Sequence, residues 1–159
     1  MDSSFEWIDG PAEHQMNPSI QDGINGEWKL LSSSNINAFL DSQPDINWKE
    51  ARRIHYSNIC FRLKGKILKT CNFYNGRKNL DLHFLPFPNR DGIQFLLEDN
   101  KLISTQCGPD GTIFSKMTRK IQNNGNLRIV WERNGAICER VYEKLPNWSS
   151  TVDPFENFY

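Results

Sequence analysis

The segment ICERVYEKL, residues 137–145, places an arginine and a tyrosine where they could act together on one ligand. Its alternation of apolar and polar residues indicates a β-strand, and side chains two apart on a strand point to the same face. Arg140 and Tyr142 therefore share a face. A guanidinium matches a carboxylate with paired, charge-assisted hydrogen bonds, and a phenol can donate one more. This chemistry is useful only if both side chains point into the protein.

Two turns determine the register of the last three predicted strands. Asn-Gly at 134–135 is typical of a two-residue hairpin turn, and counting outward from it places Ile129 opposite Arg140. The preceding connection suits a three-residue loop with Gly125 in the left-handed conformation, which places Arg119 opposite Ile129. Arg119, Ile129 and Arg140 are therefore predicted to form one row across three strands.

The composition of the two faces indicates which of them lies inside. The face with this row is largely apolar and also holds Ile113, Met117, Leu127, Trp131, Ala136, Cys138 and Tyr142. The opposite face holds Lys116, Lys120, Arg128, Glu132, Glu139 and Glu143. The apolar face is predicted to be the interior, so both arginines point inward. Because an unpaired guanidinium in a dry core is costly, the two arginines need water or an anion.

Three interpretations of the inward arginines stay open. Acidic residues on other strands could pair with them, or the register could slip and leave one of them outside. The functional interpretation is a water-containing cavity in which Arg119, Arg140 and Tyr142 bind a carboxylate, with each charged hydrogen bond contributing about 1.5–3 kcal/mol. The hydrocarbon tail of the ligand would then lie along Met117, Ile129 and Trp131.

The strands that must position these residues are short and alternate on a period of two. Apolar residues share one face at 59, 61 and 63, at 80, 82 and 84, and at 93, 95 and 97. Turn-rich segments such as PFPNRDG and GPDG separate these runs, which indicates an antiparallel meander. The fold is therefore predicted to be mainly β.

One interval predicts helices instead. Ile36, Phe39 and Leu40 fall at helical spacing behind Ser34, a good N-cap residue. The segment PDINWKEARRIHY, residues 44–56, offers further capping residues and a second apolar helical face. Two short helices are expected after the first strand.

Composition and charge limit the class of protein. The chain has 159 residues, 38% hydrophobic and 24% charged, as expected of one soluble globular domain. Its acidic start lacks the pattern of a secretory signal, and no apolar run reaches the roughly 20 residues that span a bilayer, so a cytoplasmic location is expected. The four cysteines, which show no metal-ligand spacing, are expected to be reduced, and no metal or cofactor is expected.

The charge is distributed unevenly, although its sum is zero. Residues 1–26 carry −5, residues 146–159 carry −2, and residues 27–145 carry +7. The predicted organisation is an acidic N-terminal extension (1–23), a basic, mainly β domain (24–145) and an acidic, aromatic C-terminal extension (146–159). The two extensions are rich in Pro, Ser and Asn and show no apolar period.

Two motifs resemble the intracellular lipid-binding protein family, which contains the fatty-acid-binding and cellular retinoid-binding proteins. NGEWKLLSSSNINAFL, residues 25–40, looks like that family's first strand and helix, and ICERVYEKL looks like its last strand. The resemblance implies that residues 24–145 form a lipid-binding β-barrel. This barrel would be ten-stranded, up-and-down and antiparallel, with a two-helix lid between strands 1 and 2. The family's carboxylate-binding residues fall on Arg119, Arg140 and Tyr142. Phe39 and Phe73 are candidate portal residues, with a core role equally compatible.

The sequence departs from the family pattern in three places. Ile36 replaces a usual aromatic residue, residues 72–94 align only with gaps, and the hairpin at 123–126 is one residue longer. The shape of the preferred ligand is therefore open. The expected function is non-covalent binding and intracellular transport of a long-chain fatty acid or a similar acid such as a retinoid acid.

Other functions are less compatible with the sequence. The three histidines, His14, His55 and His83, are dispersed and no nucleophile motif accompanies them, so no enzymatic activity is expected. The outward strand faces mix Glu with Lys and Arg, which argues against nucleic-acid binding. Arg52 and Arg53 on the second predicted helix could make transient contact with anionic membranes. The protein is expected to be a monomer.

A different class of function stays open as well. The barrel could serve as a scaffold for an interaction or adaptor protein, with the extended tails binding a protein partner. The C-terminal stretch VDPFENFY would be a candidate peptide motif for such a partner.

Overall fold

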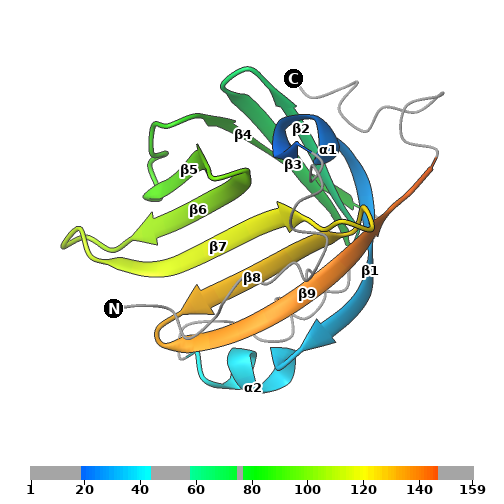
Figure 1. Ribbon diagram of the computed structural model, residues 1–159. Coiled ribbons are helices and arrows are strands. Elements are labelled where there is room, and N and C mark those ends of the chain that lie inside the picture. The colour runs from blue at the N-terminus through cyan, green and yellow to red at the C-terminus, as the bar shows by residue number, and fades with distance from the viewer. Residues whose placement is uncertain (1–18, 44–57, 75–76, 147–159) are drawn as a thin grey trace.

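The computed structural model describes residues 19–43, 58–74 and 77–146, with the side chains of 73–79 left aside (Figure 1). It contains two short helices, α1 (Ile20–Gly23) and α2 (Ile36–Asp41). The strands are β1 (Gly26–Ser34), β2 (Ile59–Lys64), β3 (Ile67–Tyr74), β4 (Arg77–Phe84), β5 (Ile93–Glu98), β6 (Lys101–Cys107), β7 (Ile113–Ile121), β8 (Leu127–Arg133) and β9 (Ala136–Lys144).

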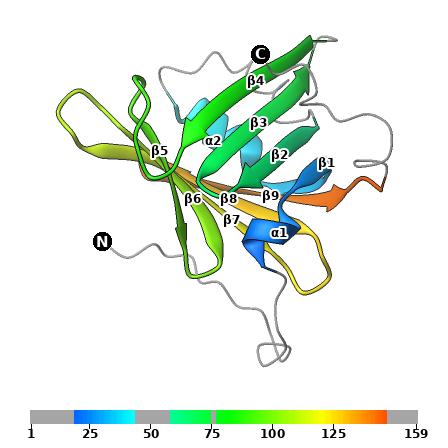
Figure 2. The same ribbon diagram turned by 90° about the horizontal axis from the view of Figure 1, so that it is seen from above.

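These strands form one antiparallel sheet that curves into a nearly closed barrel. The order of the strands is β4-β3-β2-β1-β9-β8-β7-β6-β5, so the first strand pairs with the last. Between β4 and β5, no ladder of hydrogen bonds closes the sheet in the described part of the chain. Figure 2 shows β2–β4 and β5–β7 as two walls of the curved sheet. The predicted up-and-down barrel is confirmed.

The described part of the barrel has nine strands, whereas the family resemblance implied ten. The connection from β4 to β5 contains Pro86 and Pro88, which have no backbone N–H to donate to a ladder. This connection therefore forms turns, held by hydrogen bonds such as the one from Phe87 N–H to Phe84 O, at 2.8 Å.

The first predicted helix of the lid is present as α2, between β1 and β2. Its N-cap is Asn35 and not Ser34 as predicted. Asn35 adopts the left-handed conformation, with a φ of 63°, and its side-chain amide donates to Ile137 O at 2.8 Å. The helix is thereby fixed to β9 instead of being capped by a serine hydroxyl. The second predicted helix falls within residues 44–57, outside the described residues.

The predicted register of the last three strands is confirmed. Arg119 pairs with Ile129, and Ile129 pairs with Arg140, across β7, β8 and β9. Gly125 has a φ of 89°, as the three-residue loop between β7 and β8 requires. The two turns set these pairings because each turn fixes which residues meet first.

The end of the barrel near the start of β1 is closed by residues just before that strand. Ile20, on α1, and Ile24 are buried, and the indole N–H of Trp28 donates to Ile24 O at 2.9 Å. Asn25 accepts a hydrogen bond from Leu63 N–H at 2.6 Å. Helix α1 lies in the predicted N-terminal extension, yet it packs on the main core. The division at 1–23, 24–145 and 146–159 stays a prediction.

The apolar residues that alternate along β4 face outward. Leu82 and Phe84 are 42% and 54% exposed. The pairing with β3 explains this orientation, because His83 lies opposite Leu68, which is completely buried in the core. Residues directly opposite on paired strands share a face. Asp81 and His83 of β4 therefore face the interior.

Candidate ligand-binding cavity

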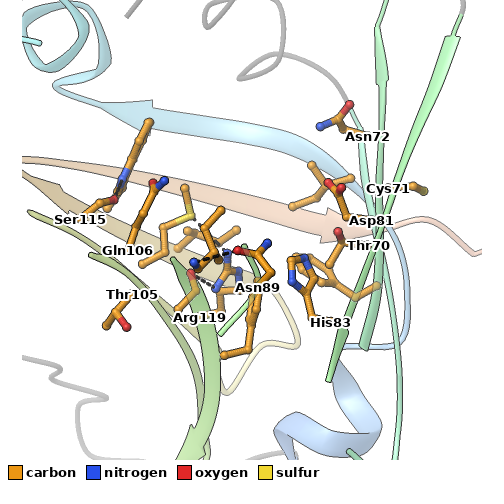
Figure 3. Close-up of a pocket in the computed structure, with 18 of the residues that line it drawn as sticks. Thr70, Cys71, Asn72, Asp81, His83, Asn89, Thr105, Gln106, Ser115 and Arg119 are labelled. Atoms are coloured by element: carbon orange, nitrogen blue, oxygen red, sulfur yellow. Dashed lines mark hydrogen bonds between the residues drawn. The ribbon is translucent and has the colours of Figure 1, made fainter. Parts of the chain in front are cut away.

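A cavity of about 420 Å³ lies between the two walls of the barrel. This volume falls in the usual range for pockets that hold a small ligand. The wall formed by β2–β4 contributes Thr70, Asn72, Asp81 and His83, and the wall formed by β5–β7 contributes Ser104, Gln106, Ser115, Met117 and Arg119. Strands β8 and β9, between the walls, contribute Ile129, Trp131 and Arg140. Figure 3 shows His83 and Asp81 on one side of this space and Arg119 on the other.

Arg119 projects into the cavity from β7 and is 7% exposed. Its guanidinium donates to Ser104 Oγ at 3.0 Å and to Met117 Sδ at 3.2 Å. The same group lies over the rings of Phe95, at 5.1 Å, and Phe61, at 5.8 Å. These aromatic faces attract the cation but do not neutralise it.

Arg140 projects into the cavity from β9 and is 6% exposed. Its Nη1 donates to the hydroxyl oxygen of Tyr142 at 2.9 Å. Because that oxygen accepts a bond from Arg140, the hydroxyl proton of Tyr142 can be donated to a third group. Arg140 and Tyr142 therefore form a preorganised pair of donors.

The two arginines have no anionic partner within the described ranges. The ion pair observed there joins Arg128 to Glu139, at 2.8 Å, on the outer face. The Nε atoms of both Arg119 and Arg140 are buried without a hydrogen-bond partner. Buried polar atoms are nearly always paired, so these two guanidinium donors beside one cavity are well suited to bind an acceptor that enters it. Pairing of either arginine with an inward carboxylate is not found among these residues.

Electrostatics within the cavity also favours an anion. Burial lowers the pKa of Arg119 to about 9, and repulsion from Arg140 contributes to this lowering. Burial raises the pKa of the Tyr142 hydroxyl, although nearby Arg140 opposes this effect. At neutral pH, Arg119 is therefore still cationic and Tyr142 still carries its proton. A carboxylate entering the cavity would relieve the repulsion between the two guanidiniums.

The predicted tail residues lie beside this charged group. Met117, Ile129 and Trp131 all line the cavity, and the indole N–H of Trp131 donates to Ser115 Oγ at 2.8 Å. Cys138 is buried nearby, and burial raises the pKa of its thiol to about 11. Such a thiol is protonated at neutral pH, which fits a packing role.

The two candidate portal residues have different placements. Phe39 is completely buried on α2, with its ring centroid 4.6 Å from that of Trp131. It closes the barrel end beneath α2, and its role as a portal stays a prediction. Phe73 lies in β3, and its side chain is outside the described residues.

The sequence interpretation missed the polar wall of the cavity. Ser104, Asp81 and His83 line it, and the His83 ring lies 4.4 Å from that of Phe95, between centroids, across the opening from β4 to β5. Burial lowers the pKa of His83, Asp81 raises it, and Arg119 lowers it further. Pairing β3 with β4 from their shared turn would have indicated these residues, because Leu68 then faces the core beside His83.

Other predictions depend on parts of the chain that are not described. The membrane contact assigned to Arg52 and Arg53 lies there, as does the adaptor role of the tails. Among the helices that the structure describes, neither has the length and apolar character needed to cross a membrane.

Comparison with known proteins gives one sequence relative and a clear structural likeness. No protein-family model matches the chain. The chain is 33% identical over 135 residues to the uncharacterized protein EEED8.2 of Caenorhabditis elegans. This alignment covers 80% of the chain and 44% of the relative, so the chain spans less than half of that protein's length.

The structural likeness is to the apo crystal structure of Caenorhabditis elegans lipid binding protein 8 (LBP-8). The TM-score is 0.63 at 18% sequence identity, covering 77% of this chain and 96% of that chain. At this level of identity, the likeness shows a shared fold. The resemblance drawn from the sequence is therefore confirmed at the level of the fold.

Proposed function

We propose that this protein binds a lipid with a carboxylate head group inside its barrel, without covalent chemistry. The single observation that carries the proposal is the pair of buried arginines beside the cavity, each with an unpartnered Nε. Two buried cations without a carboxylate among the described residues need an anion. The fold supports a lipid as that anion, because LBP-8, a lipid binding protein, has the same fold.

The head group would be held by Arg140 and Tyr142 directly. Their hydrogen bond of 2.9 Å keeps both donors oriented before the ligand enters. Arg119 would complete the site, directly or through water. Charge-assisted hydrogen bonds of this kind each contribute about 1.5–3 kcal/mol. The hydrocarbon part would contact Met117, Ile129 and Trp131, which line the cavity from the paired strands β7 and β8.

The ligand class that fits best is a long-chain fatty acid or a related amphipathic acid such as a retinoid acid. A protein that encloses such an acid in an internal cavity would carry it through the cytoplasm, where the free acid is poorly soluble. No residue is assigned a catalytic role in this proposal.

The test compares an acid with its matching alcohol. Replacing Arg140 by methionine keeps the length and apolar stem of the side chain but removes its charge. Binding of palmitate, measured by isothermal titration calorimetry, should weaken at least tenfold. Binding of hexadecanol should change little, because an alcohol carries no charge for Arg140 to recognise.

Lys116→Met serves as the matched control, because Lys116 is exposed on the outward face of β7. It removes one positive charge from the protein but none from the cavity, so both affinities should be kept. If Arg140→Met lowered the affinities for acid and alcohol equally, the site would not recognise the charge of the ligand. Unchanged binding of both would remove Arg140 from the site.

A further inference from the structure

One corner of the barrel exposes apolar and basic side chains together. We call it the corner patch, and it consists of Lys64, Lys66, Ile67, Leu82, Phe84 and Phe87. The exposed fractions are 44% for Ile67, 42% for Leu82, 54% for Phe84 and 70% for Phe87. Single exposed apolar residues are ordinary on a protein surface, but four large ones gathered at one corner are not.

The strand pairings hold this patch together. Lys64 lies opposite Ile67, and Ile67 lies opposite Phe84, in one row across β2, β3 and β4. The next row places Leu82 opposite Lys69. All of these positions face outward, because the neighbouring positions Leu63, Leu68 and His83 face the interior.

Two backbone hydrogen bonds bring in the remaining members. Leu85 N–H donates to Lys66 O at 2.8 Å, which holds the turn between β2 and β3 against the end of β4. Phe87 N–H donates to Phe84 O at 2.8 Å, so the most exposed phenylalanine stays beside Phe84. The patch is therefore built on paired strands and closed turns.

Both charged members of the corner patch are basic. Lys64 and Lys66 are exposed at the same turn, and the outward positions next along β2 and β3 are Arg62 and Lys69. The outward positions of β4 beside them carry leucine and phenylalanine, and its acidic residue, Asp81, lines the cavity on the other face. Exposed apolar side chains beside lysines are complementary to an anionic lipid bilayer, whose head groups are negatively charged and whose acyl chains are apolar.

We propose that the corner patch docks the protein onto anionic lipid bilayers. The phenylalanines and Ile67 enter the boundary between head groups and acyl chains, and the lysines contact anionic head groups. A protein partner fits less well, because stable protein interfaces bury about 1,200–2,000 Å², and four partly exposed side chains supply far less apolar area. A fluid bilayer needs no matching shape.

This surface is distinct from the lid. The patch lies at the turn next to Leu63, which is bonded to Asn25 just before β1. Helix α2 follows the other end of β1 and caps the opposite end of the barrel (Figure 1). Docking through the patch also brings β4, whose outer edge pairs with no other strand among the described residues, close to the bilayer. The proposal does not depend on which ligand the cavity holds.

The test measures binding of the full chain to vesicles by flotation. Vesicles of phosphatidylcholine mixed with phosphatidylserine should bind the protein, and salt should weaken the binding. Phe84→Thr combined with Phe87→Ser should lower the binding constant about tenfold per phenylalanine. Lys64→Gln combined with Lys66→Gln should lower it about fivefold per lysine on these vesicles, and much less on pure phosphatidylcholine.

Ile113→Thr is the matched control. Ile113, which the alternation placed on the interior face, is 56% exposed at the start of β7, a strand that contributes no residue to the patch. It should bind vesicles as the unchanged protein does. Absence of vesicle binding by the unchanged protein, or equal binding by the patch variants and Ile113→Thr, overturns the proposal. A dimer in solution that the phenylalanine double variant converts to monomer also overturns it, because the patch would then join two copies of this chain.

Discussion

Arg119 and Arg140 are charged side chains that the barrel buries beside a cavity and leaves only partly bonded. Each makes a hydrogen bond to a neutral hydroxyl, from Ser104 or Tyr142, and each keeps a buried Nε without a partner. A neutral hydroxyl satisfies one donor but leaves the charge in place. At the residue scale, the structure therefore stores an unfavourable electrostatic energy that an anionic ligand can release.

The lowered pKa of Arg119 predicts a pH dependence of ligand binding. The cation binds the carboxylate, so the affinity for palmitate should be constant from above the pKa of a carboxylic acid, about 4–5, up to about 9, the pKa of Arg119. It should fall as the pH rises through the pKa of Arg119. Binding at a pH close to this value should also take up protons, because the bound acid stabilises the charged form. Calorimetry in two buffers of different ionisation enthalpy measures this uptake. Arg119→Met should abolish it, and a fall in affinity that persists in this variant would assign the titration to another group.

Helix α2 is held on the barrel by a group of buried polar contacts as well as by its apolar face. Gln43, just after α2, accepts hydrogen bonds from Arg133 at 2.9 Å and from Asn134 at 3.1 Å. Its amide donates to Arg133 O at 3.1 Å. The apolar face of α2 packs on Trp131 and Cys138. At the element scale, the helix is therefore fixed to the β8–β9 hairpin at two places.

Removing the polar contact should destabilise the protein more than an ordinary surface change. Gln43→Ala takes an acceptor from the buried Arg133 guanidinium, which should lower the free energy of unfolding by about 1–3 kcal/mol in a urea titration. Gln21→Ala is the control, because Gln21 is exposed on α1 and should change stability by less than about 0.5 kcal/mol. Similar values for the two variants would show that α2 is held by its apolar face alone.

The barrel as a whole combines a closed apolar end with a polar, partly open cavity. Residues around Trp28 fill the end next to α1, while the two arginines and the polar wall occupy the middle. In the described part of the chain, no other strand pairs with the facing edges of β4 and β5, where His83 and Phe95 are in ring contact. At the scale of the molecule, stability and ligand affinity are therefore expected to oppose each other at the buried arginines.

A double variant should reveal this opposition. Arg119→Met combined with Arg140→Met replaces two buried cations by apolar side chains, which should raise the free energy of unfolding of the ligand-free protein by at least about 1 kcal/mol. Palmitate at about 100 times its Kd should stabilise the unchanged protein by about 2.7 kcal/mol and leave the double variant unaffected. Thermal denaturation with and without palmitate measures both effects. A less stable double variant would mean that the arginines already contribute to stability without a ligand.

The sequence by itself determined the β class, helix α2 and the inward direction of Arg119, Arg140 and Tyr142. The inward direction of these three residues depends on local information: a two-residue turn, a glycine with positive φ, and the alternation of side chains along the strands counted from these turns. Neighbouring strands joined by tight turns have little freedom in register, so counting along the chain is enough.

Only the tertiary structure decided which residues lie across the cavity from Arg119 and Arg140. The alternating residues of β4 do not by themselves indicate which face of the strand is buried. Its pairing with β3 places His83 inside and leaves Phe84 exposed. The short helix α1 is placed by the open barrel end that it fills, and four residues have too few internal hydrogen bonds to form a helix alone. The cavity brings together segments far apart in the chain, and its shape depends on the curvature of the whole sheet, which no single segment encodes.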